Sequence, residues 1–111
     1  MELLPKDARE NLPKLYAQEG TDDPTVHLKF FFPAAGWTWF VTEGQSEGDD
    51  FTFFGYVIGF EREWGYFSLR ELEEINVHHL TVERDLDFRQ EKVSVCLARW
   101  KDELGEAAER F

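Results

Sequence analysis

The sequence has little cysteine and few cations. Its single cysteine, Cys96, excludes an internal disulfide and a zinc cage built from several thiolates. We interpret it as a buried or half-buried thiol rather than a reactive nucleophile. The chain has 12 Lys and Arg against 23 Asp and Glu, which gives a formal net charge of -11. A field of this sign repels phosphate backbones and anionic membranes, so direct binding to nucleic acid or to a lipid surface is disfavoured.

Long hydrophobic runs are also missing. No stretch approaches the roughly 20 apolar residues of a membrane-spanning helix. The start, MELLPKDARE, has neither the cationic region nor the long apolar region of a signal peptide. No linker, low-complexity tract or solenoid-length repeat interrupts the chain. We therefore expect one soluble, cytoplasmic domain over residues 1–111.

Aromatic side chains are abundant, with Phe 11, Trp 4 and Tyr 3. They concentrate in two adjacent segments, GWTWFVTEG and FTFFGYVIGF. Such rings form either a surface platform that stacks a ligand or an unusually aromatic core. Because one buried Phe or Trp removes about 150–250 Å² from water, a few rings can seal a short sheet. We favour the core interpretation.

Apolar residues in alternation predict the strands. They occur at residues 25–32, 36–43, 51–60, 64–67 and 81–88, and the last is expected at a sheet edge. The polar, glycine-containing segment 43–50 is expected to be an exposed hairpin loop. Thr42 is expected to pair with Thr52 across that loop. This register places the Trp39 indole over Gly55, the aromatic rescue of a strand glycine.

Helical spacing occurs at residues 3–20, at 68–76 and from residue 91 onward. The stretch from Ser68 to Glu71 has the form of a capping box, which predicts a helix start at Ser68. The tail favours an amphipathic helix, although alternation at residues 93–97 leaves a strand as the alternative. The fold class we predict is α+β, with a mostly antiparallel sheet of about five strands and N-terminal, inserted and C-terminal helices.

Several segments together resemble a known family. They are ELLPKDARENLPKLYAQEG, VHLKFFFP, GWTWFVTEG, FFGYVIGFEREWGYFSLRELEEI and VERDLDF. Over residues 2–88 the chain is similar to the bacterial and phage proteins grouped as domain of unknown function 2958. The resemblance implies small proteins carried on plasmids, phages and integrated elements, sometimes beside DNA-transfer or anti-restriction genes, with no assigned activity. Residues 89–111 depart from that pattern and are expected to form a C-terminal helical extension.

The sequence offers little evidence for catalytic, metal-binding or cofactor-binding residues. An acid/base pair needs one carboxylate desolvated while the other stays ionised, and turn positions such as Glu61 and Glu63 rarely provide this. Glu43 lies beside tryptophans, so a small hydrolase that uses Glu43 is one hypothesis, which we rank below the two binding hypotheses given below. Adjacent histidines on an extended segment point in opposite directions, so His78 and His79 predict no metal site. No phosphate-binding glycine loop or nucleophile elbow is present, so we expect no cofactor and nominate no catalytic residue.

Binding of a ligand or partner, without catalysis, is the remaining interpretation of the function. One face of the strands 36–43 and 51–60 combines hydroxyls with rings, and its members are Thr38, Phe40, Thr42, Thr52, Phe54 and Tyr56. If left uncovered, this face is a groove suited to a peptide or a small aromatic ligand. A helix that covers it is the alternative that we favour. Glu43 and Trp100 complete the set of candidate binding residues.

Two function hypotheses follow, and they belong to different classes. The first is a non-enzymatic binding module that acts through a protein partner, either by the aromatic sheet face or by the C-terminal helix. The second is an acidic mimic of DNA that occupies the basic groove of a host nuclease or restriction enzyme. Carboxylates massed at phosphate-like spacing, with binding that weakens steeply with salt, would favour mimicry.

Overall fold

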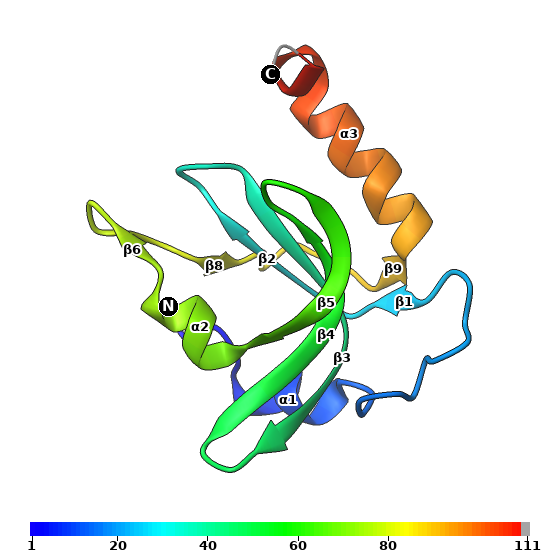
Figure 1. The fold of residues 1–111 in the computed structure, drawn as a ribbon. Coiled ribbons are helices and arrows are strands. Elements are labelled where there is room, and N and C mark those ends of the chain that lie inside the picture. The colour runs from blue at the N-terminus through cyan, green and yellow to red at the C-terminus, as the bar shows by residue number, and fades with distance from the viewer. Residues whose placement is uncertain (110–111) are drawn as a thin grey trace.

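The computed structural model describes the backbone of residues 1–109 and the side chains of residues 1–101. It confirms the α+β class, with helices near both ends of the chain and one between strands (Figure 1). The elements in chain order are α1 Lys6–Asn11, β1 Thr25–Val26, β2 Leu28–Phe32, β3 Trp37–Glu47, β4 Asp50–Ile58, β5 Arg62–Ser68, α2 Leu69–Glu74, β6 Asn76–Val77, β7 Leu80–Thr81, β8 Glu83–Arg84, β9 Glu91–Lys92 and α3 Val93–Glu109.

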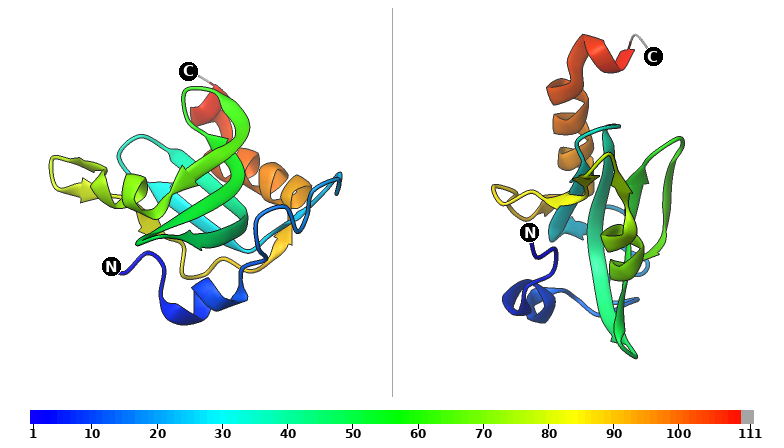
Figure 2. Two further views of the ribbon diagram at one scale, coloured as in Figure 1. Left: turned by 60° about the horizontal axis from the view of Figure 1, so that its bottom comes forward. Right: turned by 90° about the vertical axis from the view of Figure 1, so that its left-hand side faces the viewer.

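Five strands form the main sheet in the order β5-β4-β3-β2-β8, and every pairing in it is antiparallel. This confirms the predicted sheet and the edge position of β8. Two small ribbons accompany it, β1 with β9 and β6 with β7. Figure 2 shows α3 rising beside one end of the sheet instead of lying across it. No helix within the described residues is long and apolar enough to cross a membrane.

The core is aromatic and lies on both faces of the sheet. The first cluster includes Phe30, Trp39 and Phe53, packed with the leucines of the N-terminal segment and of α2. Phe30 and Phe53 meet edge to face, with ring centroids 5.5 Å apart. The second cluster lies under α3 and comprises Val26, Phe40, Ile58, Val93, Cys96 and Trp100. The expectation of an aromatic core is therefore confirmed, and α3 is part of it.

The helices agree with the sequence in kind but not in extent. Only Lys6–Asn11 of the segment 3–20 is helical, because Pro13 follows closely and the chain then runs through turns. The predicted cap is confirmed, since the Ser68 Oγ accepts the Glu71 N–H at 3.1 Å. α3 confirms the predicted C-terminal helix, and the strand alternative at 93–97 is wrong.

Two predicted strands are shorter than expected. The segment 25–32 divides at His27, whose N–H donates to the Val41 carbonyl at 2.8 Å. Regular alternation over residues 25–32 would place Val26 on the face of Phe30, but the break moves Val26 to the second cluster. In the segment 81–88 only Glu83–Arg84 pairs with the main sheet. Leu86, which regular alternation from Val82 would place on the core side, is 67% exposed.

The β3–β4 hairpin corrects the predicted loop and register. β3 continues to Glu47, so most of the segment 43–50 is strand and the turn is confined to Gly48 and its neighbour. Because the turn is tighter than expected, Thr52 pairs with Gln45 and not with Thr42, and Val41, not Trp39, is opposite Gly55. A register shift lies between Val41 and Glu43. Gly55 instead lies directly against the Phe40 carbonyl.

An indole does cover a glycine, but not the expected pair. A Cβ added at Gly59 would lie 2.5 Å from the Trp37 ring, so Trp37 occupies the space that the missing side chain leaves. Trp37 also meets the exposed Phe60 edge to face, with ring centroids 5.1 Å apart. The aromatic filling that the sequence indicates is therefore present, but with Trp37 against Gly59 instead of Trp39 against Gly55.

Candidate binding site on the open sheet face

The bulge at Thr42 decides which face of the sheet Glu43 occupies. In regular alternation Glu43 would follow Trp39 and Val41 into the first apolar cluster. A carboxylate there would lose its hydration without compensation. The extra residue instead pairs Glu43 with Phe54, on the opposite face. β-Bulges commonly re-aim a side chain in this way.

Glu43 fastens the N-terminal loop to the sheet. Its Oε1 accepts the Tyr16 N–H at 2.8 Å, and its Oε2 accepts the Gln18 N–H at 2.7 Å. Hydrogen bonds to a charged acceptor are among the stronger ones in proteins. They hold Tyr16 at a φ of 73, a left-handed conformation that a bulky residue rarely adopts. The Glu43 side chain is 4% exposed in this arrangement.

Gln18 and Thr42 complete the polar framework. The Gln18 amide donates to the carbonyls of Thr25 at 2.9 Å and of Thr42 at 3.0 Å, and its oxygen accepts the Thr25 N–H at 2.8 Å. The Thr42 hydroxyl donates to the Phe54 carbonyl at 3.1 Å. These bonds satisfy backbone groups that the bulge removes from the strand ladder. The loop is therefore a fixed wall above the sheet.

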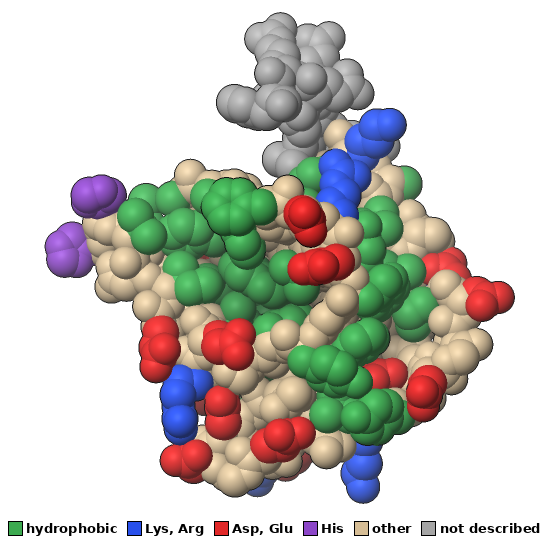
Figure 3. Space-filling model, in the orientation of Figure 1, with side chains coloured by type: hydrophobic (Ala, Val, Ile, Leu, Met, Phe, Trp, Pro, Cys, Tyr) green, Lys and Arg blue, Asp and Glu red, His purple; other side chains and the backbone are tan. Residues whose placement is uncertain are grey.

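A line of four rings crosses β4 and β5 on the same face, and we call it the aromatic row. Its members are Tyr56, Trp64, Phe54 and Tyr66. Phe54 stacks on Trp64 with an interplanar angle of 14° and centroids 5.7 Å apart, and on its other side it meets Tyr66 at 4.9 Å. Trp64 is 42% exposed and Tyr66 is 56% exposed. Figure 3 shows hydrophobic side chains exposed in patches on the side of the molecule turned to the viewer, with acidic side chains between and around them.

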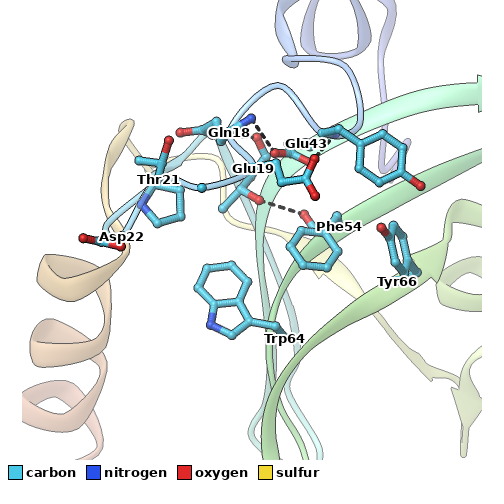
Figure 4. Close-up of a pocket in the computed structure, with 12 residues that line it drawn as sticks. Gln18, Glu19, Thr21, Asp22, Glu43, Phe54, Trp64 and Tyr66 are labelled. Carbon is cyan, nitrogen blue, oxygen red and sulfur yellow. Dashed lines mark hydrogen bonds between the residues drawn. The ribbon is translucent and has the colours of Figure 1, made fainter.

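A cavity of about 290 Å³ lies between the aromatic row and the loop. Figure 4 shows Phe54, Trp64 and Tyr66 on one side and Gln18, Glu19, Thr21 and Asp22 on the other. The remaining lining residues are Tyr16, Gly20, Pro24, Thr42 and Glu43. Rings supply one wall and a loop held by hydrogen bonds supplies the other, so the cavity is preformed.

The cavity is electronegative. Its lining has the carboxylates of Glu19, Asp22 and Glu43, and none of the Lys and Arg side chains that the structure describes contributes to it. A hydrogen bond with the Tyr16 hydroxyl is the main cause that raises the pKa of Tyr66, followed by partial burial. The charges of Glu43 and Glu19 raise the pKa of Tyr66 further.

The structure divides the residues predicted for the site. Thr42, Glu43 and Phe54 line the cavity, and Tyr56 lies beside it in the aromatic row. Thr52 is on the same face, further along β4. The expected covering helix is present only in part, since α3 covers the end of the face near Phe40 and Tyr56 and leaves Trp64 and Tyr66 exposed.

The other predicted residues belong to the interior or to a second cavity. Thr38 is buried, and its hydroxyl donates to the Gly36 carbonyl at 3.4 Å. Phe40 and Trp100 are buried in the second cluster and border a cavity of about 350 Å³ beside α3. Burial raises the pKa of the neighbouring Cys96 thiol to about 11, which keeps it protonated and unreactive at neutral pH.

Sequence reasoning missed Tyr16, Gln18, Trp64 and Tyr66. A usable signal existed for the last two, because Trp64 and Tyr66 alternate around Gly65 and so share a face of β5. No comparable signal marks Tyr16 or Gln18, which reach the site only through Glu43.

Histidines do not assemble a metal site in the described part of the chain. His78 and His79 are exposed at the β6–β7 turn, both with positive φ. No group of three or more His, Cys, Asp or Glu within the described residues could hold a metal ion. Burial lowers the pKa of His27, whose Nδ1 has no hydrogen-bond partner among these residues.

Comparison with known proteins agrees with the resemblance seen in the sequence. A family model described as "Protein of unknown function (DUF2958)" matches residues 3–108. The chain belongs to this DUF2958 family. The match continues past residue 88 through most of α3, so the helix that we separated as an extension lies within the region shared with the family. No curated protein and no solved structure matches the chain.

Proposed function

We propose that this DUF2958 protein is a non-enzymatic binding module that acts through a protein partner, and that the partner contacts the aromatic row. The observation that carries the proposal is the exposure of Trp64 and Tyr66 on a sheet face whose other end is covered by α3. Contiguous exposed rings are uncommon on monomeric proteins and are typical of interaction surfaces. The formal net charge of -11 favours a partner with a basic surface.

Glu43 supports binding rather than hydrolysis in this proposal. Both of its oxygens accept backbone N–H groups, so its first role is to hold the loop that walls the cavity. A general base must be directed at the proton it removes, and it works together with a second group that acts as acid. The two hydrogen bonds at Glu43 direct its oxygens at the loop backbone, which favours a structural role over a catalytic one.

Quantitative affinity capture tests the proposal. The family resemblance implies carriage on a mobile element, so the extract should come from a bacterial host of such an element. Tagged wild type, Trp64→Ala and Leu80→Ser proteins would be compared, because Leu80 is an exposed apolar residue on the separate β6–β7 ribbon. We expect a specific protein to be retained by the wild type and by Leu80→Ser and lost from Trp64→Ala. Equal recovery by all three proteins would refute the proposed surface.

Salt dependence separates this proposal from mimicry of DNA. An apolar contact with few ion pairs persists in about 1 M salt, where the Debye length is about 3 Å. A mimic that replaces many phosphates would lose its partner steeply over the same range. Retention of the partner at high salt therefore favours the aromatic row, and its loss favours an acidic surface.

A further inference from the structure

The cavity beside the aromatic row has two features that together favour a positively charged ligand. One wall consists of aromatic rings, in which Phe54 and Trp64 are nearly parallel and Tyr66 meets Phe54 at 4.9 Å between centroids. The rest of the lining contains the carboxylates of Glu19, Asp22 and Glu43. Aromatic faces attract cations electrostatically, and they do so more strongly where water is excluded. A cation would gain from both walls, whereas an anion would be repelled by the carboxylates.

Glu43 retains acceptor capacity within this cavity. An ionised carboxylate offers about four acceptor positions. Backbone N–H groups of Tyr16 and Gln18 use one position on each oxygen. No Lys or Arg among the described residues forms an ion pair with it. Within the part of the chain whose side chains are described, this largely buried charge is held by neutral donors and no ion pair to it is present.

The size of the cavity limits the ligand. Its volume of about 290 Å³ lies at the bottom of the range of about 300–1,000 Å³ that is typical for small-molecule sites. This volume suits one side chain rather than a nucleotide or a large cofactor. The surrounding exposed rings would contact the rest of the surface from which such a side chain projects.

We propose that this cavity receives an arginine side chain of the protein partner, with the guanidinium against the Phe54–Trp64 pair and directed at the Glu43 carboxylate. The inference rests on the proposed function and names the chemistry of the contact. Arginine is chosen over lysine because its planar guanidinium stacks on rings, is less strongly hydrated and forms forked hydrogen bonds to carboxylates. Arginine is also enriched among the residues that dominate interface energetics.

NMR titration with single amino-acid probes tests the arginine contact without a known partner. N-acetyl-L-arginine methylamide would be added to the ¹⁵N-labelled full chain, with the neutral citrulline analogue as the matched control. We expect saturable shifts of the Trp64 indole N–H and of the Gln18 amide, with citrulline binding at least about tenfold weaker. Assignment of the indole signal uses Trp64→Phe, which preserves the ring wall.

Two substitutions sharpen the test. Trp64→Ala removes an exposed ring, so the fold should persist and arginine binding should fall about tenfold. Glu19→Gln removes an exposed carboxylate of the lining and should weaken binding less, with no change in folding. Dispersed amide signals in both spectra would show that the variants are folded.

The outcomes are separable from those of the capture experiment. Equal binding of citrulline and arginine, tighter binding of the lysine analogue, or no shift at Trp64 would overturn the arginine assignment. Capture that still depends on Trp64 would then leave the proposed function intact. Conversely, arginine binding with capture that ignores Trp64 would support the cavity and reject the aromatic row as the partner surface.

Discussion

The Glu43 carboxylate accepts the backbone N–H of Tyr16 at 2.8 Å, across a sequence separation of 27. This bond joins the bulged strand β3 to the N-terminal loop, in which Tyr16 has a left-handed backbone conformation. The cavity lies between the strand and the loop. Glu43 is therefore both a fastener of the fold and a wall of the candidate site.

Glu43→Gln should destabilise the protein although it is nearly isosteric. Both carboxylate oxygens face N–H donors, so one donor would meet the amide NH₂ and lose its acceptor. A buried donor left unsatisfied costs about 1–3 kcal/mol of unfolding free energy. Urea denaturation would measure the loss. Glu47→Gln, at the exposed end of β3, is the control and should match the wild type. Equal stability of Glu43→Gln and the wild type would contradict the assigned role.

Gly55→Ala should be far more damaging than Gly65→Ala, although the two glycines are paired across β4 and β5. A Cβ at Gly55 would overlap the Phe40 carbonyl oxygen, while a Cβ at Gly65 meets nothing within 4 Å. Since backbone cannot move aside as a side chain does, we expect a loss of at least about 3 kcal/mol for Gly55→Ala. Thermal and urea unfolding of both variants would measure the difference. Comparable stability of the two would show that the observed register is incorrect.

Trp100→Ala should detach α3 from the sheet. Trp100 is buried in the second cluster, and the Arg62 guanidinium lies 4.7 Å from its ring centroid. Loss of a buried Trp costs about 3–5 kcal/mol. Removal of the exposed Arg62 partner in Arg62→Ala should cost at most about 1 kcal/mol. Urea unfolding followed by circular dichroism compares them. A Trp100→Ala protein as stable as Arg62→Ala would mean that α3 contributes no core.

Cys96 should make stability depend on pH in alkaline solution. Burial raises its pKa to about 11 in the folded chain, whereas an unfolded thiol titrates near about 8.5. Between these values the unfolded state binds fewer protons, so the free energy of unfolding falls as pH rises from about 9 to about 11. The same contribution is fully present below about pH 8. Cys96→Ala should show a shallower decline over this window, and identical slopes for the two proteins would refute the effect.

The sequence predicted the elements better than their register. Strand alternation and the Ser68 cap are local signals, so the sheet and α2 were found from them. The bulge at Thr42 has no local signal. It arises because regular alternation would place Glu43 in the first apolar cluster, a constraint that appears only when both faces of the sheet are known.

The same limit applies to the site. Phe54 and Tyr56 were nominated because they share a face of one strand. Tyr16 and Gln18 approach them only through hydrogen bonds to Glu43, and sequence spacing contains no record of that contact. The break at His27, which places Val26 in the second cluster, could not be predicted either, because it depends on a hydrogen bond to the distant Val41 carbonyl.

The central claim is that the aromatic row is the surface buried by the partner. Hydroxyl-radical footprinting of the free protein and of the captured complex tests it directly, because Trp64, Tyr66 and the distant Leu86 are all exposed in the free chain. We predict that Trp64 and Tyr66 are oxidised in the free protein and protected in the complex, while Leu86 is oxidised equally in both. Unchanged oxidation of Trp64 and Tyr66 in the complex would contradict the claim.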